Sequence, residues 1–133
     1  MAPSPEPPGD DALGELIGIE HLEGSEDTAR ARVAVTDRIL QPYGIVHGGV
    51  YPVLAETVCS KATHDAVTGE GKLALGQSYS ATLLRPVSEG HVNASARARH
   101  RGRTSWVWQV EISDDEGRLC CLVQVVVAVR EAG

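Results

Sequence analysis

The residues best suited to catalysis lie together in the stretch QPYGIVHGGVYPVLAETVCS, residues 41–60. His47, Gly48 and Gly49 come directly before an apolar segment, and Glu56 stands inside that segment. A helix N-terminus that contains glycines exposes backbone N–H groups and the positive end of the helix dipole. Such donors stabilise an oxyanion or a polarised carbonyl. The stretch therefore predicts a site for a polarised carbonyl near a carboxylate.

Glu56 is notable because its neighbours in the first half of the segment are nearly all apolar. Burying a carboxylate costs free energy unless the group has partners or a function. Ser60 follows one helical turn later, and Thr63 lies on the same side. A less specific interpretation remains open for each residue. His47 could cap a tight turn, Glu56 could be solvated, and the two hydroxyls could bond back to helix carbonyls.

The elements that must position these residues are one helix and several strands. The segment 50–67 predicts the helix, with a stripe of small residues that can lie close against a sheet: Ala55, Val58, Cys59, Ala62 and Ala66. Pro52 fits in its first turn, where backbone N–H groups have no partner within the helix. The other segments alternate apolar and polar residues or are rich in apolar residues, which predicts strands at 13–23, 29–36, 73–84, 91–100, 105–113 and 118–129.

This order of elements predicts an α+β fold in which one long helix packs against a strongly curved antiparallel sheet of five to six strands. Such a sheet covers only one side of the helix. The apolar first half of the helix then needs a second surface, and a second copy of the chain would supply it. We expect a homodimer at minimum, assembled further as a dimer of dimers.

Length and composition restrict the class of protein. The 133 residues predict a flexible, proline-rich acidic tail at 1–12 and one domain at 13–133. The net charge of −6 disfavours nucleic-acid binding, and no apolar run is long enough to span a bilayer. Cys120 and Cys121 are adjacent and would point to opposite faces of a strand, which argues against a disulfide framework and favours a cytoplasmic protein. No spacing of cysteines or histidines indicates a metal site.

The motifs QPYGIVHGG and LAET, with Ser60 after them, resemble those of the hotdog-fold acyl-CoA thioesterases of the PaaI type. The resemblance runs from about Leu16 to Val129 and includes RPVSEG, HRGR and GRLCC. It is closest to the branch that contains EntH-type proofreading thioesterases and 4-hydroxybenzoyl-CoA thioesterases. It implies a hotdog fold and hydrolysis of an acyl-CoA or acyl-carrier thioester to the free acid and thiol. It implies no cofactor, because CoA is part of the substrate.

The resemblance also implies roles for single residues. Glu56 corresponds to the catalytic carboxylate, acting as nucleophile or as general base on water. The Gly48 N–H corresponds to the donor that polarises the thioester carbonyl. His47 and Gln41 correspond to residues that orient the carbonyl or the water, and Ser60 to the hydroxyl that positions the water or the acid.

Further residues are candidates for binding the substrate. Gly49 and Thr63 flank the predicted catalytic residues, and Arg101 and Arg103 belong to the one cationic cluster of the chain. Arginine suits the phosphates of CoA, although a solvated strand face with ordinary ion pairs explains the cluster equally well. Leu83 and Leu84 stand where EntH-type enzymes have histidines, which favours a less polar acyl group.

Two other functions remain open at this point. The same fold could hydrate an enoyl thioester or dehydrate a hydroxyacyl thioester. It could also bind acyl-CoA without turnover. The position of Glu56 within the helix after HGG favours hydrolysis over hydration or dehydration. Binding without turnover is disfavoured by the intact set of Gln41, His47, Gly48, Glu56 and Ser60.

Overall fold

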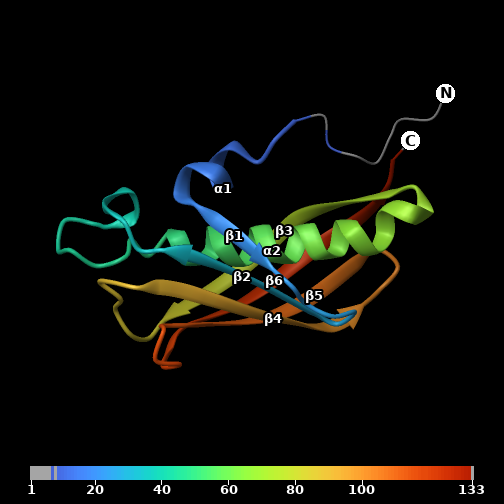
Figure 1. Ribbon diagram of the computed structural model, residues 1–133. Coiled ribbons are helices and arrows are strands. Elements are labelled where there is room, and N and C mark those ends of the chain that lie inside the picture. Colours follow the sequence, from blue (N-terminus) through green and yellow to red (C-terminus); the bar gives the residue numbers. More distant parts are fainter. Residues whose placement is uncertain (1–6, 8, 133) are drawn as a thin grey trace.

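A long helix lies in the concave side of a curved antiparallel sheet in the computed structural model, which describes residues 7 and 9–132 (Figure 1). The helix is α2 (Val50–Val67), of 18 residues. The six strands run in the order β1-β2-β4-β5-β6-β3. Their bounds are β1 (Ile19–Leu22), β2 (Thr28–Ala34), β3 (Lys72–Leu83), β4 (His91–Arg101), β5 (Ser105–Ser113) and β6 (Leu119–Glu131). Among the described residues, no helix is both long and apolar enough to cross a membrane.

The predicted α+β architecture is confirmed, and so are both ends of the central helix. The prediction of a strand at 13–23 is wrong in its first half, because Ala12–Ile17 forms the short helix α1. Asp11 caps α1 by accepting a hydrogen bond from the N–H of Gly14 at 3.0 Å, and Gly18 ends it with a φ of 85°. The predicted flexible tail lies mostly outside the described residues and stays a prediction.

The sheet buries α2 through a face that shifts along the helix. Ala55, Val58 and Cys59 are buried as predicted, whereas Ala62 is half-buried and Ala66 is exposed. In the last turns, Thr63 and Val67 face the core in their place. A straight helix on a twisted sheet meets the strands with a changing face, so the small-residue stripe covers only the first part of the contact.

A buried hydrogen-bond chain joins α2 to β5. The indole N–H of Trp108 donates to the hydroxyl of Thr63 at 2.9 Å, and that hydroxyl donates to the carbonyl of Cys59 at 2.8 Å. Both side chains are almost fully buried, and Trp106 stacks on Trp108 with ring centroids 6.0 Å apart. Because a buried N–H needs an acceptor, this bond restricts how far α2 can rotate about its axis relative to the sheet.

The chain itself buries much of the apolar first half of α2 and leaves Val53 half-buried, so the expected second copy stays a prediction. Val50 and Leu54 are buried by the chain itself, together with Ile39 and Val46 of the preceding loop. Four of the nine exposed large apolar side chains of the described residues lie on and just after the edge strand β3: Leu75, Tyr79, Leu83 and Leu84. The β3 edge is therefore one apolar surface that a second copy could cover.

The Trp108–Thr63 bond can be tested by substitution. Thr63→Val keeps the volume of the side chain but leaves the buried Trp108 N–H without an acceptor. We expect a loss of about 1–3 kcal/mol in the free energy of unfolding, measured by urea denaturation. Thr63→Ser retains the hydroxyl and is the control for removing a methyl group. Equal stability of the valine variant and the wild type would contradict a structural role for this bond.

Candidate active site

The loop before α2 is held in place by backbone hydrogen bonds at both of its ends. The N–H of His47 donates to Ile39 at 2.7 Å, and the N–H of Val46 donates to Val87 at 2.8 Å. Gln41 closes a tight turn inside the loop, because its side-chain oxygen accepts the N–H of Tyr43. The side-chain amide of Gln41 keeps its donor N–H groups for other partners. The loop therefore delivers His47 to the start of α2 in a defined position.

His47 both caps the tight turn before the helix and keeps a free donor. Its Nδ1 accepts the backbone N–H of Gly49 at 3.1 Å. A ring nitrogen that accepts cannot carry the proton, so in the neutral imidazole the proton is on Nε2. The capping interpretation of His47 is thus confirmed, and the exposed ring still presents an N–H outward. The backbone N–H of Gly49 is therefore already hydrogen-bonded to His47 and is not available to a substrate.

Gly48 presents an unused backbone donor. Within the described part of the chain, its N–H has no hydrogen-bond acceptor. A Cβ built on Gly48 would lie 2.9 Å from Cδ1 of Leu83, so this apolar side chain covers the glycine closely. A donor beside an apolar group is shielded from water, which strengthens its interaction with a carbonyl oxygen.

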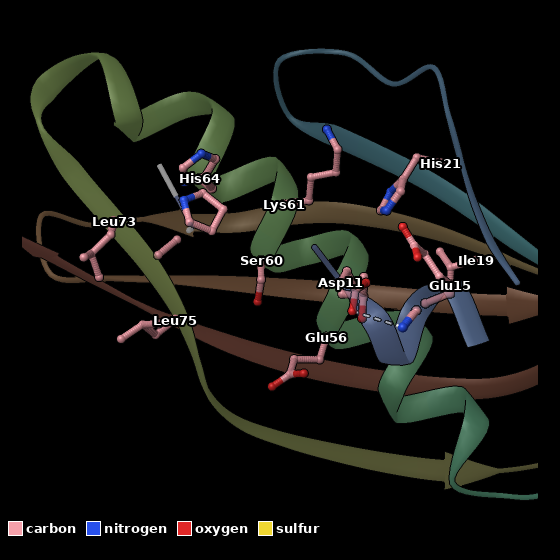
Figure 2. A pocket seen from close by; sticks show the side chains of 14 residues that line it. Asp11, Glu15, Ile19, His21, Glu56, Ser60, Lys61, His64, Leu73 and Leu75 are labelled. Carbon is pink, nitrogen blue, oxygen red and sulfur yellow. Dashed lines mark hydrogen bonds between the residues drawn. The ribbon is translucent and has the colours of Figure 1, made fainter. Parts of the chain in front are cut away.

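Glu56 and Ser60 point into a cavity of about 860 Å³ between α1, α2 and β3 (Figure 2). The carboxylate of Glu56 has no hydrogen-bond or ion-pair partner among the described residues, and it is half-buried. The hydroxyl of Ser60 is buried and likewise lacks a partner there. A carboxylate and a hydroxyl without protein partners are available to a substrate and a water molecule.

The rest of the cavity wall escaped sequence analysis. The helix contributes Thr57, Lys61 and His64, which share one face of α2 with Glu56 and Ser60, so their spacing could have revealed them. The opposite wall comes from other elements and has no local signal: Asp11, Gly14, Glu15, Ile19, His21, Leu73, Ala74 and Leu75. Partial burial and then the positive charge of Lys61 lower the pKa of His21. This wall is therefore of mixed polarity, with a histidine that favours its neutral form.

The two halves of the predicted site are separate within one chain. Gln41, His47 and Gly48 do not line the cavity that contains Glu56. Gly48 and Glu56 are eight positions apart, which corresponds to about 12 Å along α2. A glutamate side chain spans only part of that distance. One thioester carbon cannot contact both groups of the same helix.

Thr63 and Cys59 lie in the core rather than at the site. The predicted role of Thr63 in substrate binding conflicts with its complete burial and with its bonds to Trp108 and Cys59. Thr63 has the same helical phase as Glu56, but the sheet covers this face of α2 at the level of Thr63. Burial raises the pKa of the Cys59 thiol, as expected for a packing residue and not for a nucleophile.

The predicted phosphate-binding arginines lie at the end of β4, for Arg101, and in the turn between β4 and β5, for Arg103. Arg101 forms ion pairs with Asp27 at 3.1 Å and with Glu26 at 3.4 Å. Its guanidinium also lies over the ring of Trp106, 4.4 Å from the centroid. Arg103 is exposed in the adjoining turn. Of the two, Arg103 is therefore the better placed to receive a ligand.

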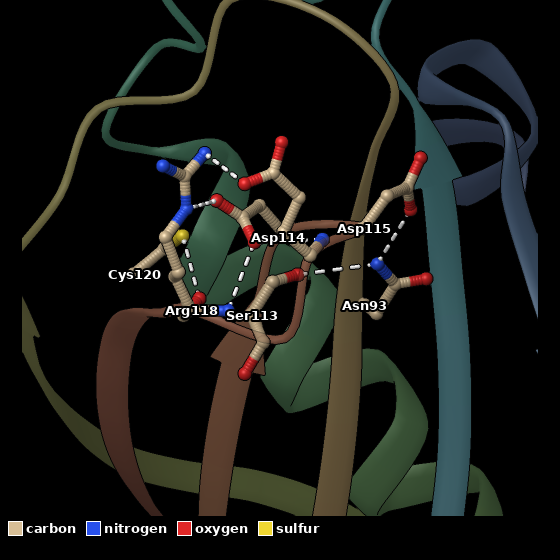
Figure 3. Close-up of polar contacts among 7 residues, drawn as sticks. Asn93, Ser113, Asp114, Asp115, Arg118 and Cys120 are labelled. Carbon is tan, nitrogen blue, oxygen red and sulfur yellow. Dashed lines mark hydrogen bonds and ion pairs between the residues drawn. The ribbon is translucent and has the colours of Figure 1, made fainter.

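A second polar cluster closes the turn between β5 and β6 (Figure 3). Asp114 accepts two backbone N–H groups of this turn and the guanidinium of Arg118 at 2.7 Å. A hydrogen bond from Asn93, followed by one from His91, holds the pKa of Asp115 below its usual range. These side chains satisfy one another, so the cluster is a structural turn and not a candidate site. The described residues include no group of three or more histidine, cysteine or acidic side chains that could hold a metal ion.

The family model described as the thioesterase superfamily matches residues 43–121, which include the loop, the helix and most of the sheet. The chain belongs to the thioesterase superfamily. It is 38% identical to the proofreading thioesterase EntH of Cronobacter turicensis, over 88% of this chain and 85% of the relative. It is also 38% identical to the 1,4-dihydroxy-2-naphthoyl-CoA hydrolase of Escherichia coli, over 87% of each chain. The crystal structure of a variant of thioesterase PA1618 from Pseudomonas aeruginosa superimposes with a TM-score of 0.86 and 34% identity, covering 90% of this thioesterase and 86% of that chain.

Replacing His47 separates its two possible roles in this thioesterase. His47→Ala removes both the cap on Gly49 and the outward Nε2 donor, whereas His47→Asn offers a shorter side chain that can still cap. If the donor acts on the substrate carbonyl, both variants should lose about 10²–10³ in kcat. Steady-state kinetics and thermal unfolding measure the two roles. Loss of stability alone, with kcat retained, would make His47 a capping residue only.

Proposed function

We propose that this thioesterase, as a member of the PaaI type, hydrolyses an acyl-CoA or acyl-carrier thioester to the free acid and thiol. The observation that supports this most strongly is the unpartnered carboxylate of Glu56 in the cavity beside the unpartnered hydroxyl of Ser60. The name of the Escherichia coli relative, a CoA hydrolase, supports a CoA ester as the substrate. The close cover of Gly48 by Leu83 supports a less polar acyl group.

In this proposal the thioester carbonyl oxygen receives hydrogen bonds from the Gly48 N–H and from the Nε2 of His47. Gln41 orients the carbonyl or the water through its amide N–H groups. Polarisation makes the carbonyl carbon electrophilic and stabilises the negative charge that develops on oxygen. Ser60 holds the attacking water or the carboxylate of Glu56. These roles use the groups that have no partner within the described chain.

Glu56 can act by either of two balanced routes. As a nucleophile, its oxygen bonds to the carbonyl carbon, the C–S bond breaks, and the thiolate leaves and takes a proton. Water then hydrolyses the mixed anhydride, which releases the acid and restores Glu56. As a general base, Glu56 takes a proton from water while the water attacks, and the proton passes to the departing thiolate.

The proposed catalytic unit is a dimer with composite sites. Two α2 helices that run antiparallel about a two-fold axis would bring Gly48 of one chain to Glu56 of the other. The exposed apolar side chains on the β3 edge, including Tyr79 and Leu83, support a second copy at that surface. Each dimer then has two equivalent sites, and further pairing of dimers is compatible with this arrangement.

The CoA part of the substrate would be held by positive charge. We propose that Arg103 contacts the phosphates, with Arg101 held nearby by Glu26 and Asp27. The three cysteines are free and buried, which supports the proposed cytoplasmic location. No cofactor takes part in the proposed reaction.

Replacing the catalytic carboxylate tests the proposed function directly. Glu56→Gln should keep the fold and lower kcat for thioester hydrolysis by at least about 10²–10⁴-fold, because an amide is neither a base nor a nucleophile. Thiol release from a panel of aryl, phenylacetyl, short-chain and long-chain acyl-CoA esters measures the loss. Glu15→Gln makes the same change on another carboxylate of the cavity and should remain active. More than a tenth of wild-type kcat in Glu56→Gln would show that Glu56 is not the catalytic group.

Mixing two inactive variants tests the composite site. His47→Ala and Glu56→Gln are combined after reversible dissociation, so that half of the dimers are hybrids. In a hybrid, one site carries both defects and the other carries neither, so activity should return to roughly a quarter of wild type. Each variant taken alone through the same treatment is the control. If verified hybrids stay inactive, each site lies within one chain.

A further inference from the structure

The edge strand β3 contains an extra residue directly opposite the catalytic helix. Gly76 pairs with Val127 of β6, whereas Ser78 pairs with Val126, so Gln77 has no partner in the ladder. This is a β-bulge, and it reverses which residues of β3 face α2. Gly76, before the bulge, pairs with Val127, and Tyr79, after it, pairs with Val125, and these two valines lie on the same face of β6.

Gly76 lies directly against the side chain of Glu56 on α2. A Cβ built on Gly76 would lie 2.9 Å from both Cγ and Cδ of Glu56, and closer still to Oε1. Real Cβ atoms do not come this close to other heavy atoms. The space in which the Glu56 carboxylate rests therefore exists only because residue 76 has no side chain.

The backbone at Gly76 does not itself require glycine. The five described glycines with positive φ are Gly18, Gly44, Gly71, Gly90 and Gly117, and Gly76 is not among them. A larger residue could adopt the same backbone conformation. Glycine within a strand normally weakens it, so its presence here is explained by the close approach of the glutamate.

We propose that Gly76 is a positioning residue for Glu56, with the bare backbone of the β3 bulge forming the wall against which the carboxylate is held beside Ser60. This inference rests on the proposed function only in taking Glu56 as the catalytic group. The wall restricts the rotamers of a carboxylate that otherwise has no partner in the described chain. A misplaced catalytic group loses rate while the rest of the substrate still binds.

The kinetic test is Gly76→Ala, which adds one methyl group. We expect the methyl group to displace the Glu56 carboxylate and to lower kcat for thioester hydrolysis by at least about tenfold, with KM changed by less than about threefold. Gly69→Ala is the matched control, because Gly69 has open space around it and no positive φ. Wild-type kcat in Gly76→Ala, together with an inactive Glu56→Gln, would overturn the positioning role.

A double-mutant cycle on thermal unfolding tests the contact without using activity. Gly76→Ala should shift the unfolding midpoint less favourably in the wild-type background than the same change does in the Glu56→Ala background, because the methyl group forces the Glu56 side chain to move. In the Glu56→Ala background the space is empty, and the same change should leave the midpoint unchanged or raise it. Equal shifts in both backgrounds would overturn the inference. If Glu56→Gln proved active while the cycle still showed coupling, the proposed function would fail and the steric contact would stand.

Discussion

The curved sheet can cover only part of the circumference of α2. Which side chains of α2 face the sheet and which face the cavity therefore decides the position of each candidate residue. Trp108 of β5 needs an acceptor for its buried N–H and finds it on Thr63, one hydrogen bond from the backbone of the helix itself. An unpaired N–H at this depth would cost about 1–3 kcal/mol. The bond therefore restricts the rotation of α2 relative to the sheet, and the twist of the sheet leaves Glu56 and Ser60 uncovered at their level of the helix.

The length of α2 separates the hydrogen-bond donors of the candidate site from its carboxylate. The loop and the first residues of α2 carry the hydrogen-bond donors, whereas the carboxylate follows two turns later. The edge strand β3 lies along both parts. Leu83 covers Gly48 at one level, and Gly76 leaves room for Glu56 at another. A single edge strand thus shapes the surroundings of the donor and of the acid, and its exposed apolar side chains mark where a second copy would complete the site.

A minority of the described charged residues of this acidic chain form ion pairs with one another. Arg32 pairs with Glu20, Arg101 with Asp27, and Arg118 with Asp114. Exposed ion pairs contribute little to stability, so their main effect is to hold the strand ends and turns in register. Within the cationic cluster, Arg101 is consequently less available to phosphates than the exposed Arg103. The cavity beside Glu56 has mixed polarity instead of a strong positive field.

The sequence alone was sufficient for the features that repeat locally. The central helix was predicted to the residue, and five strands were predicted to within a few residues, because alternating and helical periodicities are visible in short windows. The motifs around His47 and Glu56 also lie within one short stretch of sequence, and they indicated the family. α1 was missed because six residues between an aspartate cap and a glycine carry too little periodic signal.

Only the tertiary structure decided which residues meet. Thr63 has the same helical phase as Glu56, yet it lies in the core because the sheet covers the helix at that level. The cavity walls from α1 and β1, and the bare backbone of Gly76 against Glu56, join segments that are far apart in the chain. Local patterns specify what a segment can form. The close approach of two segments depends on the twist of the sheet and the fit of the side chains between them, which no short stretch of sequence contains.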